Sequence, residues 1–326
     1  MTRQHNTILL FCLKCLRKIK KIIFRKKTNT SESTSTEYTI AVQKSSDLIS
    51  DYIQNDKPCM IARFGSVELS CVANYLKLSD MNFRNAIRYM KEEDVCFEWD
   101  ECVRDTMRKN AGFFPENNEN LVLFAQLMLD CIPDLDILGS WLYDEKFVKE
   151  KFENAKTVEL ASLEPYYHEK PWTRGLEGKR VLVIHPFAET IKQQYMKREN
   201  LFKNKDVLPE FTLETIKAVQ SVAYTECGFN NWFDALDSMK AQILKKEYDV
   251  AIIGCGAYGF PLASFVKRQN KKAVHLGGAT QVLFGIKGGR WDAHEFISKL
   301  YNEYWVRPNE EDTPKNAKMV EGGCYW

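Results

Sequence analysis

Short apolar runs alternate along this chain with longer segments in which apolar side chains recur every three or four residues. The short runs have the composition of strands buried on both faces of a sheet. They lie at 58–64, 135–141, 158–161, 179–184, 249–253 and 273–276. The spacing between them predicts helices at 42–53, 69–78, 100–109, 120–131, 232–245 and 260–268. This order predicts an α/β protein with a mostly parallel, Rossmann-like sheet flanked by helices.

A glycine-rich turn follows the apolar run 249–253. It reads Gly254-Cys255-Gly256-Ala257-Tyr258-Gly259, which fits G-x-G-x-x-G, and the helix expected after it has Pro261 in its first turn. Glycines let a backbone approach an anion, and a helix N-terminus presents free N–H groups. We therefore expect a phosphate site here, bound by Gly254, Gly256, Tyr258 and Gly259. A tight turn without a ligand fits the same spacing, and no acidic residue follows about 20 residues later, where ribose binding needs one.

A second strand-to-helix junction lies near the start of the folded part. The run 58–64 contains Arg63 and is followed by Gly65, Ser66 and Glu68. Ser66 is a suitable N-cap for the next helix, and Glu68 falls in its first turn. Capping does not explain Arg63, because an arginine in an apolar strand needs a partner. Ligands of open α/β sheets bind at the carboxyl ends of strands, so Arg63, Gly65 and Ser66 are candidate donor-binding residues.

Three further segments carry candidate contacts. The aromatic, proline-rich stretch 164–174 contains Glu164 and Trp172, which we expect to contact a sugar or acceptor, although a plain surface connection fits the stretch as well. His185 follows the run 179–184 and is a third candidate contact to the acceptor or sugar, although a lone histidine is more often structural than catalytic. The last strand is expected to lead into one short glycine-bounded helix, where Lys287 and Arg290 can reach phosphates.

The N-terminal segment differs from the rest of the chain. A helix is expected over 8–24, with an apolar stripe beside lysines and arginines, and no acidic residue occurs before Thr28. The segment is too short and too charged to span a bilayer, and residues 8–27 suit the surface of an anionic membrane. A frayed terminal helix is the alternative. The stretch 28–36, rich in Ser, Thr and Glu, is expected to be a flexible linker, so we divide the chain into an arm (1–37) and a folded domain (38–326).

Composition excludes some classes of function. The 326 residues are 44% hydrophobic, and 46 basic residues are balanced by 44 acidic ones. Without a global basic field, nucleic acid is not an expected partner. The ten cysteines form no paired C-x-x-C sets and no histidines lie at matching spacing, so neither a zinc site nor a disulfide framework is predicted. Reduced thiols in a cytosolic protein are the simplest interpretation.

Taken together, these motifs resemble a known family. The sequence Ala62-Arg63-Phe64-Gly65-Ser66-Val67-Glu68, with the segments 254–261 and 275–291, is similar to the GT-D fold glycosyltransferases, bacterial enzymes of cell-surface glycan assembly. The resemblance covers about 38–291. In that family a strand ends in Arg-Phe-Gly-Asp-x-Glu, and the Asp-x-Glu pair helps to bind a divalent metal and the diphosphate of a nucleotide-sugar. Here Ser66 stands in place of the aspartate.

The resemblance implies transfer of a sugar from a nucleotide-sugar donor to a glycan or lipid-linked acceptor, in the synthesis of a bacterial surface polysaccharide such as a capsule or O-antigen. It implies a peripheral enzyme at the inner face of the cytoplasmic membrane. Glu68 is then either a ligand of Mn²⁺ or Mg²⁺ or the general base, although a serine hydroxyl is a weak substitute for a carboxylate on such a metal. Two other classes stay open: a dinucleotide-dependent oxidoreductase, and a non-catalytic nucleotide-binding partner of a membrane complex.

Overall fold

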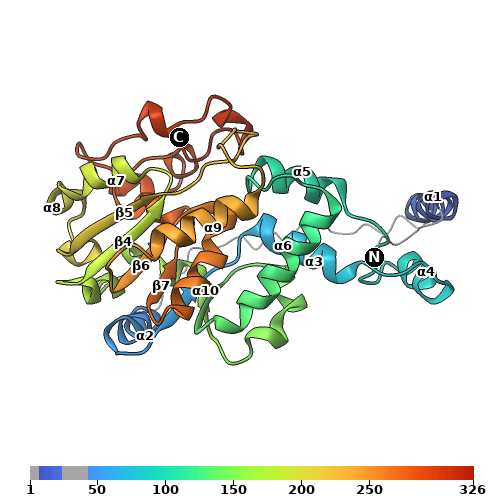
Figure 1. Ribbon diagram of the computed structural model, residues 1–326, viewed down its shortest axis with the longest axis horizontal. Coiled ribbons are helices and arrows are strands. Elements are labelled where there is room, and N and C mark those ends of the chain that lie inside the picture. The colour runs from blue at the N-terminus through green and yellow to red at the C-terminus, as the bar shows by residue number, and fades with distance from the viewer. Residues whose placement is uncertain (1–6, 24–42) are drawn as a thin grey trace.

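The computed structural model describes residues 7–23 and 43–326, and its centre is one parallel sheet (Figure 1). Seven strands form the sheet in the order β3-β2-β1-β7-β6-β4-β5. They are β1 (Cys59–Ala62), β2 (Ile137–Ser140), β3 (Lys156–Glu159), β4 (Arg180–His185), β5 (Thr212–Lys217), β6 (Val250–Ile253) and β7 (Lys272–His275). All the pairings are parallel, so the predicted fold class is confirmed.

Helices cover both faces of the sheet (Figure 1). Each face of the sheet has its own hydrophobic core. The first core lies under α3 (Ser66–Lys77), α6 (Asn118–Cys131), α9 (Trp232–Ile243) and α10 (Gly259–Arg268). The second lies under α2 (Gln43–Gln54), α7 (Ala188–Tyr195) and α11 (Ala279–Leu283). Side chains of β1 alternate between the cores, with Met60 and Ala62 in the first and Cys59 and Ile61 in the second. The burial of both faces explains why the central strands β1, β7 and β6 are largely apolar.

The connections between strands create a binding position at the carboxyl edge of the sheet. The chain leaves β1 and β6 through α3 and α10, on the first face, but it leaves β7 through α11, on the second. Open α/β sheets bind ligands where neighbouring connections leave on opposite faces. Since β7 lies between β1 and β6, residues that follow these three strands meet at such a point.

Several sequence-based boundaries need correction. β3 begins two residues earlier than predicted, and Leu160–Leu163 forms a 3-10 turn instead of continuing the strand. The stretch 164–174 contains two 3-10 turns, at Pro165–Tyr167 and Trp172–Leu176. The single helix expected after β7 is two, α11 and α12 (Gly289–Asp292), because Gly285 has a φ of +66° and ends the first.

Some elements were not predicted at all. They are α4 (Phe83–Met90), α7, the short α8 (Arg198–Leu201) and β5. β5 is an edge strand whose residues are largely exposed or half-buried, so it lacks an apolar run. α4 has no fully buried residue, and its Ala86, Tyr89 and Met90 pack only partly buried against a small core outside the sheet.

The predicted N-terminal helix is present as α1 (Thr7–Ile23). It lies beside α4 at the end of the molecule away from β5 (Figure 1), while α5 (Glu101–Lys109) lies nearer the sheet. The predicted linker at 28–36 and the basic residues at 25–27 lie outside the described residues. Within 7–23 and 43–326, no helix combines the length and apolar content needed to cross a membrane.

Candidate functional site

Arg63 is the centre of a polar cluster at the carboxyl edge of the sheet. It directly follows β1, so it is not within the strand as predicted. Its guanidinium carbon lies 4.6 Å from the ring centroid of Trp141, and a Cβ added to Gly277 would lie 2.9 Å from its Nη1. Its Nε is buried and has no hydrogen-bond partner among the described residues. Burial lowers the pKa of Arg63, and the Glu68 carboxylate opposes that shift. An anion is the partner that this guanidinium lacks.

Trp141 forms a fixed aromatic wall beside Arg63. Its indole Nε1–H donates to the Phe64 carbonyl at 3.0 Å, and its backbone N–H donates to the Glu145 carboxylate at 3.0 Å. The same buried carboxylate accepts a hydrogen bond from Ser140. The side chain is nevertheless 44% exposed. A ring that is held in place but still exposed can pack against a ligand ring without a large loss of conformational entropy.

Glu68 lies on the same side of the cluster, in the first turn of α3. The predicted N-cap Ser66 is wrong: Gly65 is the N-cap, without a side-chain hydrogen bond, and Ser66 is the exposed first residue of the helix. The Glu68 carboxyl turns back over Gly65, so a Cβ there would collide with it. Burial raises the pKa of Glu68, opposed by its own backbone N–H and by Arg63. Glu68 therefore occupies the position that a capping side chain would have taken.

Glu164 completes the cluster as a second carboxyl under the influence of Arg63. It accepts a hydrogen bond from the Tyr166 hydroxyl. Burial raises the pKa of Glu164 to about 7, although the Tyr166 hydrogen bond and the Arg63 charge both act to lower it. A carboxyl with a pKa near neutrality can exchange a proton at physiological pH, which an ordinary glutamate does poorly.

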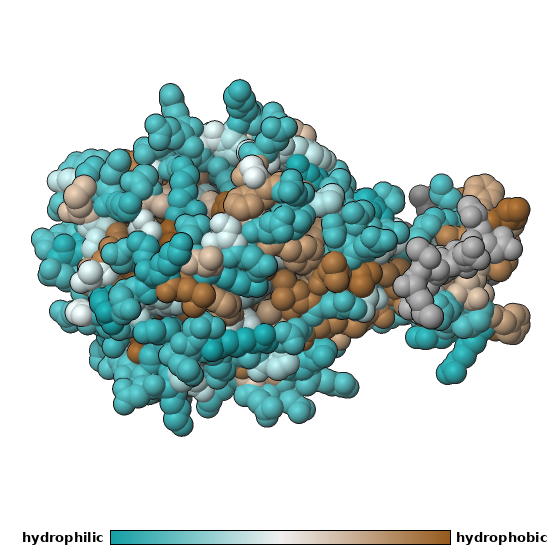
Figure 2. All heavy atoms as spheres, in the orientation of Figure 1, coloured by the Kyte–Doolittle hydropathy of each residue, from teal (hydrophilic) through white to brown (hydrophobic). Residues whose placement is uncertain are grey.

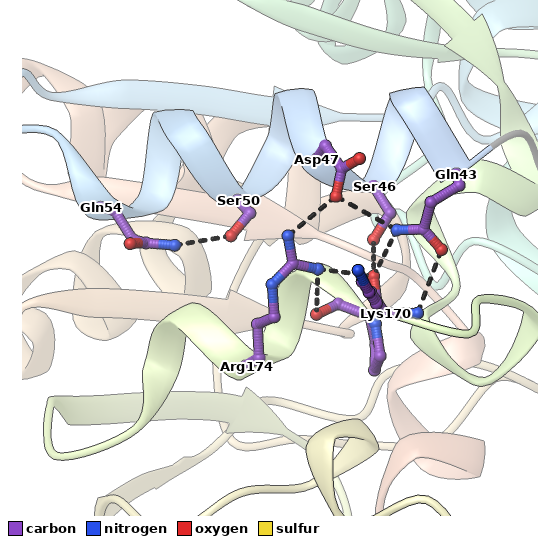
Figure 3. Close-up of polar contacts among 8 residues, drawn as sticks. Gln43, Ser46, Asp47, Ser50, Gln54, Lys170 and Arg174 are labelled. Carbon is purple, nitrogen blue, oxygen red and sulfur yellow. Dashed lines mark hydrogen bonds and ion pairs between the residues drawn. The ribbon is translucent and has the colours of Figure 1, made fainter.

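The segment that carries Glu164 is anchored from the opposite side by α2 (Figure 3). The Lys170 carbonyl accepts hydrogen bonds from Gln43, from Ser46 at 2.8 Å and from Arg174. Arg174 also forms an ion pair with Asp47 at 2.8 Å, and this hydrogen bond holds the pKa of Asp47 below its usual value. These contacts make the proline-rich stretch a fixed part of the structure, which favours a defined position for Glu164.

The glycine-rich turn after β6 is mostly filled by protein atoms. A Cβ on Gly254 would lie 2.6 Å from the Gly277 carbonyl oxygen, and one on Gly259 would collide with the His275 ring. Only Gly256 is exposed; it has a φ of +56°, and the nearest atom to an added Cβ is the Ala111 carbonyl oxygen at 3.9 Å. Packing thus accounts for two of the three glycines, and Gly256 is the one that a ligand can approach.

Three predicted contact residues are buried and belong to the core. Trp172 has no exposed surface, and its indole N–H donates to the Leu163 carbonyl at 2.9 Å. Tyr258 stacks on Trp232 at 4.8 Å. His185 accepts a hydrogen bond from the Phe187 N–H at 3.0 Å, and burial lowers its pKa to about 3. In this structure none of the three presents a surface to a sugar.

The two basic residues of the glycine-rich loop after β7 have different surroundings. The Lys287 ammonium lies over the Tyr301 ring, 5.3 Å from its centroid. Arg290 forms an ion pair with Glu321 and lies over the Tyr325 ring, 4.8 Å from its centroid. Arg63 interacts electrostatically with both Arg290 and Tyr325. The structure thus brings Arg290 to the edge of the cluster.

The residues at the cluster do not make a metal site on their own. Within the part of the chain that the structure describes, no three His, Cys, Asp or Glu residues are grouped to hold an ion. Glu68 offers one carboxylate beside the positive charge of Arg63, and Ser66 offers a neutral hydroxyl on the exposed side. Hard cations prefer several anionic oxygens. The Mn²⁺ or Mg²⁺ that the family resemblance implies remains a prediction.

Sequence reasoning missed three residues of this cluster. Trp141 and His275 each stand at the carboxyl end of a strand, so the rule that selected Arg63 also applies to them. His275 donates its Nδ1–H to the Ile253 carbonyl at 3.1 Å, and burial together with the Arg63 charge lowers its pKa to about 3. Tyr325 comes from the chain's end, and no local pattern marks it.

In comparisons with known proteins, no family model, curated protein or solved structure matches the chain. The similarity to GT-D enzymes therefore depends on the sequence motifs, and the case for a site depends on the geometry around Arg63.

Proposed function

We propose that this protein is a glycosyltransferase that takes a sugar from a nucleotide-sugar donor, with its active site at the Arg63 cluster. The observation that carries the proposal is the Arg63 guanidinium, whose buried Nε has no hydrogen-bond partner among the described residues. It is placed between an exposed tryptophan and two carboxyls of raised pKa. A leaving diphosphate, a sugar ring and an acceptor hydroxyl each need one of these groups.

Arg63 is the residue that binds the diphosphate. Guanidinium groups pair with phosphate oxygens through two parallel hydrogen bonds, and such bonds are strong where water is excluded. As the glycosidic bond to the donor breaks, negative charge grows on the leaving phosphate. A positive charge already fixed next to it lowers the barrier, because nothing has to reorganise during the reaction.

The carboxyls provide the acid–base chemistry. Glu164, with a pKa of about 7, is ionised in a large fraction of molecules at neutral pH and still basic enough to accept a proton from an acceptor hydroxyl. Glu68 is nearer the backbone of α3, where its charge interacts with Arg63. We assign the base to Glu164 and the positioning of Arg63 to Glu68. This assignment replaces the two alternative roles, metal ligand or general base, that the motif suggested for Glu68.

The acceptor in this proposal is a glycan or a lipid-linked glycan of a bacterial surface polysaccharide. A lipid-linked acceptor lies at the membrane, so the proposal places the protein peripherally at the inner face of the cytoplasmic membrane. The basic, amphipathic composition of α1 supports this location. Trp141, exposed beside Arg63, is the surface on which we place the donor's sugar ring.

A panel of nucleotide-sugars, their nucleoside diphosphates and NAD(P) in a thermal unfolding assay tests the proposal. A donor at 100 times its dissociation constant stabilises the fold by about 2.7 kcal/mol. We expect stabilisation by one nucleotide-sugar and by its nucleoside diphosphate, followed by turnover with a glycan acceptor. Stabilisation by NAD(P) alone would favour an oxidoreductase. Binding without turnover on any acceptor would favour a non-catalytic partner.

A further inference from the structure

The helix α1 packs on the rest of the protein with only one of its faces. Leu10 and Leu13 are 7% and 8% exposed and pack in a small core with Val95 and Phe97. On the same side Lys14 pairs with Glu98, and the Arg17 guanidinium lies 4.5 Å from the Tyr89 ring centroid. These contacts fix the rotation of the helix about its axis.

The opposite face of α1 is apolar and exposed. Ile8, Phe11, Ile19 and Ile22 are 77%, 67%, 50% and 71% exposed. At 3.6 residues per turn these four side chains lie within an arc of about 80°. An amphipathic helix normally turns its apolar arc toward the protein. Here a mixed face is packed and an apolar face is left uncovered, which marks a site of interaction.

The neighbouring helix α4 also exposes apolar side chains. Phe83 is 84% exposed and Ile87 is 40% exposed, and neither position was part of a predicted helix. A groove of about 690 Å³ runs between the two helices. Its lining is Leu9, Leu13, Lys20, Met81, Asn82, Phe83, Ala86, Ile87, Met90 and Lys91. Figure 2 shows a band of hydrophobic side chains over α3 and α6, and scattered hydrophobic ones among hydrophilic ones at the end that carries α1 and α4.

The charges around the surface are complementary to an anionic partner. The groove lining contains two lysines and no acidic residue. Lys18 on α1, Arg84 on α4 and Lys91 of the groove lining are exposed. Of the nearby acidic residues, Glu98, Glu92 and Glu93 pair with Lys14, Arg17 and Arg88. A second copy docked on the same surface would place cations against cations, which opposes self-association.

We propose that α1 and α4 together form a face that seats the protein on an anionic lipid bilayer. Ile8, Phe11, Ile19, Ile22, Phe83 and Ile87 enter the outer part of the acyl layer, and Lys18, Lys20, Arg84 and Lys91 meet the lipid phosphates. The groove between the helices accepts lipid chains from that layer. The inference rests on the membrane location proposed above but not on glycosyl transfer, so its test needs no donor or acceptor.

Flotation of the full-length protein with vesicles tests this face. Wild type is compared with Phe83→Glu on α4, Phe11→Glu on α1, and the matched control Met196→Glu. Met196 is 78% exposed and lies at the end of α7, away from this surface. Each substitution places one negative charge at an exposed apolar position, so none of the three disturbs a core.

We expect wild type and Met196→Glu to float with vesicles that contain phosphatidylglycerol and to remain unbound with phosphatidylcholine alone. Binding should weaken from about 0.1 M to 1 M salt, because screening shortens the reach of the charges. Phe83→Glu and Phe11→Glu should each bind at least about tenfold more weakly. Equal binding by Phe83→Glu and Met196→Glu would exclude α4 from the face. Absence of flotation, or a wild-type dimer in light scattering, would overturn the proposal whatever the enzyme's activity.

Discussion

Two strand-to-helix turns lie on either side of β7, and they use their residues in opposite ways. In the turn from β6 to α10, Gly254 and Gly259 are glycine because Gly277 and His275 leave no room for a side chain. In the turn from β1 to α3, the buried groups are charged, and the Nε of Arg63 lacks a partner among the described residues. Protein atoms fill the first turn, whereas the second contains a buried polar atom without a hydrogen-bond partner among the described residues.

The difference teaches that a glycine pattern and a binding site are separate properties. Glycines are needed wherever a strand-to-helix turn leaves no room for a Cβ, whether or not an anion is present. A buried guanidinium has no such structural use, because its desolvation is costly without a partner. We therefore place the diphosphate on Arg63; of the three glycines in the pattern, only Gly256 is exposed.

The largest effect should come from Arg63→Met, which keeps length and removes charge. Donor affinity and turnover should fall by about a hundred- to a thousandfold, because the phosphate loses its fixed positive charge. The free energy of unfolding should stay level or rise, since a buried, unpartnered donor has been removed. Calorimetric titration of the donor and urea denaturation measure the two quantities.

Arg180→Met is the matched control for Arg63→Met. Arg180 pairs with Asp249 at 3.1 Å on the opposite edge of the sheet, and it is exposed. The control should bind donor as wild type does. If Arg63→Met also binds normally while remaining folded, the anion site lies elsewhere and the contrast between the two turns fails.

The sequence predicted the fold better than it predicted the site, for physical reasons. Strands buried on both faces, such as β6, carry a continuous apolar run, and most of them were predicted within two or three residues. β5 and α4 bury little and leave no such pattern. Arg63 and Glu68 share one local motif, so their proximity was predictable. Trp141 and Tyr325 join them only through the order of the strands and the path of the C-terminal segment, which no local pattern encodes.

Trp172 was predicted to be a contact residue and is not one. A tryptophan in a polar, proline-rich stretch was expected at the surface, yet it is fully buried in the second core. Its neighbour Glu164, chosen from the same stretch, does lie with Arg63. Composition identified the segment but not which of its side chains point outward, because that depends on the 3-10 turns and on the contacts with α2.

A smaller effect is expected from Glu164→Gln, which tests whether the Glu164 carboxyl acts as the general base or only stabilises the structure. Wild-type turnover should rise with pH through about 7, where Glu164 loses its proton. The variant should lose about a hundredfold in turnover and that limb of the pH profile, while donor affinity stays nearly unchanged. Tyr166→Phe removes a hydrogen bond that lowers the pKa of Glu164, so it should move the limb to higher pH.

Glu164→Gln should also change the pH dependence of the free energy of unfolding. The native state holds the Glu164 proton up to a pH of about 7, whereas the unfolded chain releases it near 4.5, so this residue makes the wild type less stable as pH rises between those values. Glu164→Gln should therefore be more stable than wild type at pH 8 by about 1–3 kcal/mol. A pH profile that keeps its limb in the variant would assign the base to another group, with Glu68 the next to be tested.

The smallest expected effect is a difference in stability between alanine variants at two glycines of the turn after β6. Gly254→Ala places a methyl group against the Gly277 carbonyl oxygen, a backbone atom that cannot move without shifting α11, so unfolding should become easier by about 1–3 kcal/mol. Gly256→Ala meets no atom closer than 3.9 Å and should cost only the strain of a positive φ, about 1 kcal/mol. Urea denaturation of the two variants measures the difference directly. Equal losses would mean that Gly256 is also a packing residue, and the turn would then offer no approach to a ligand at all.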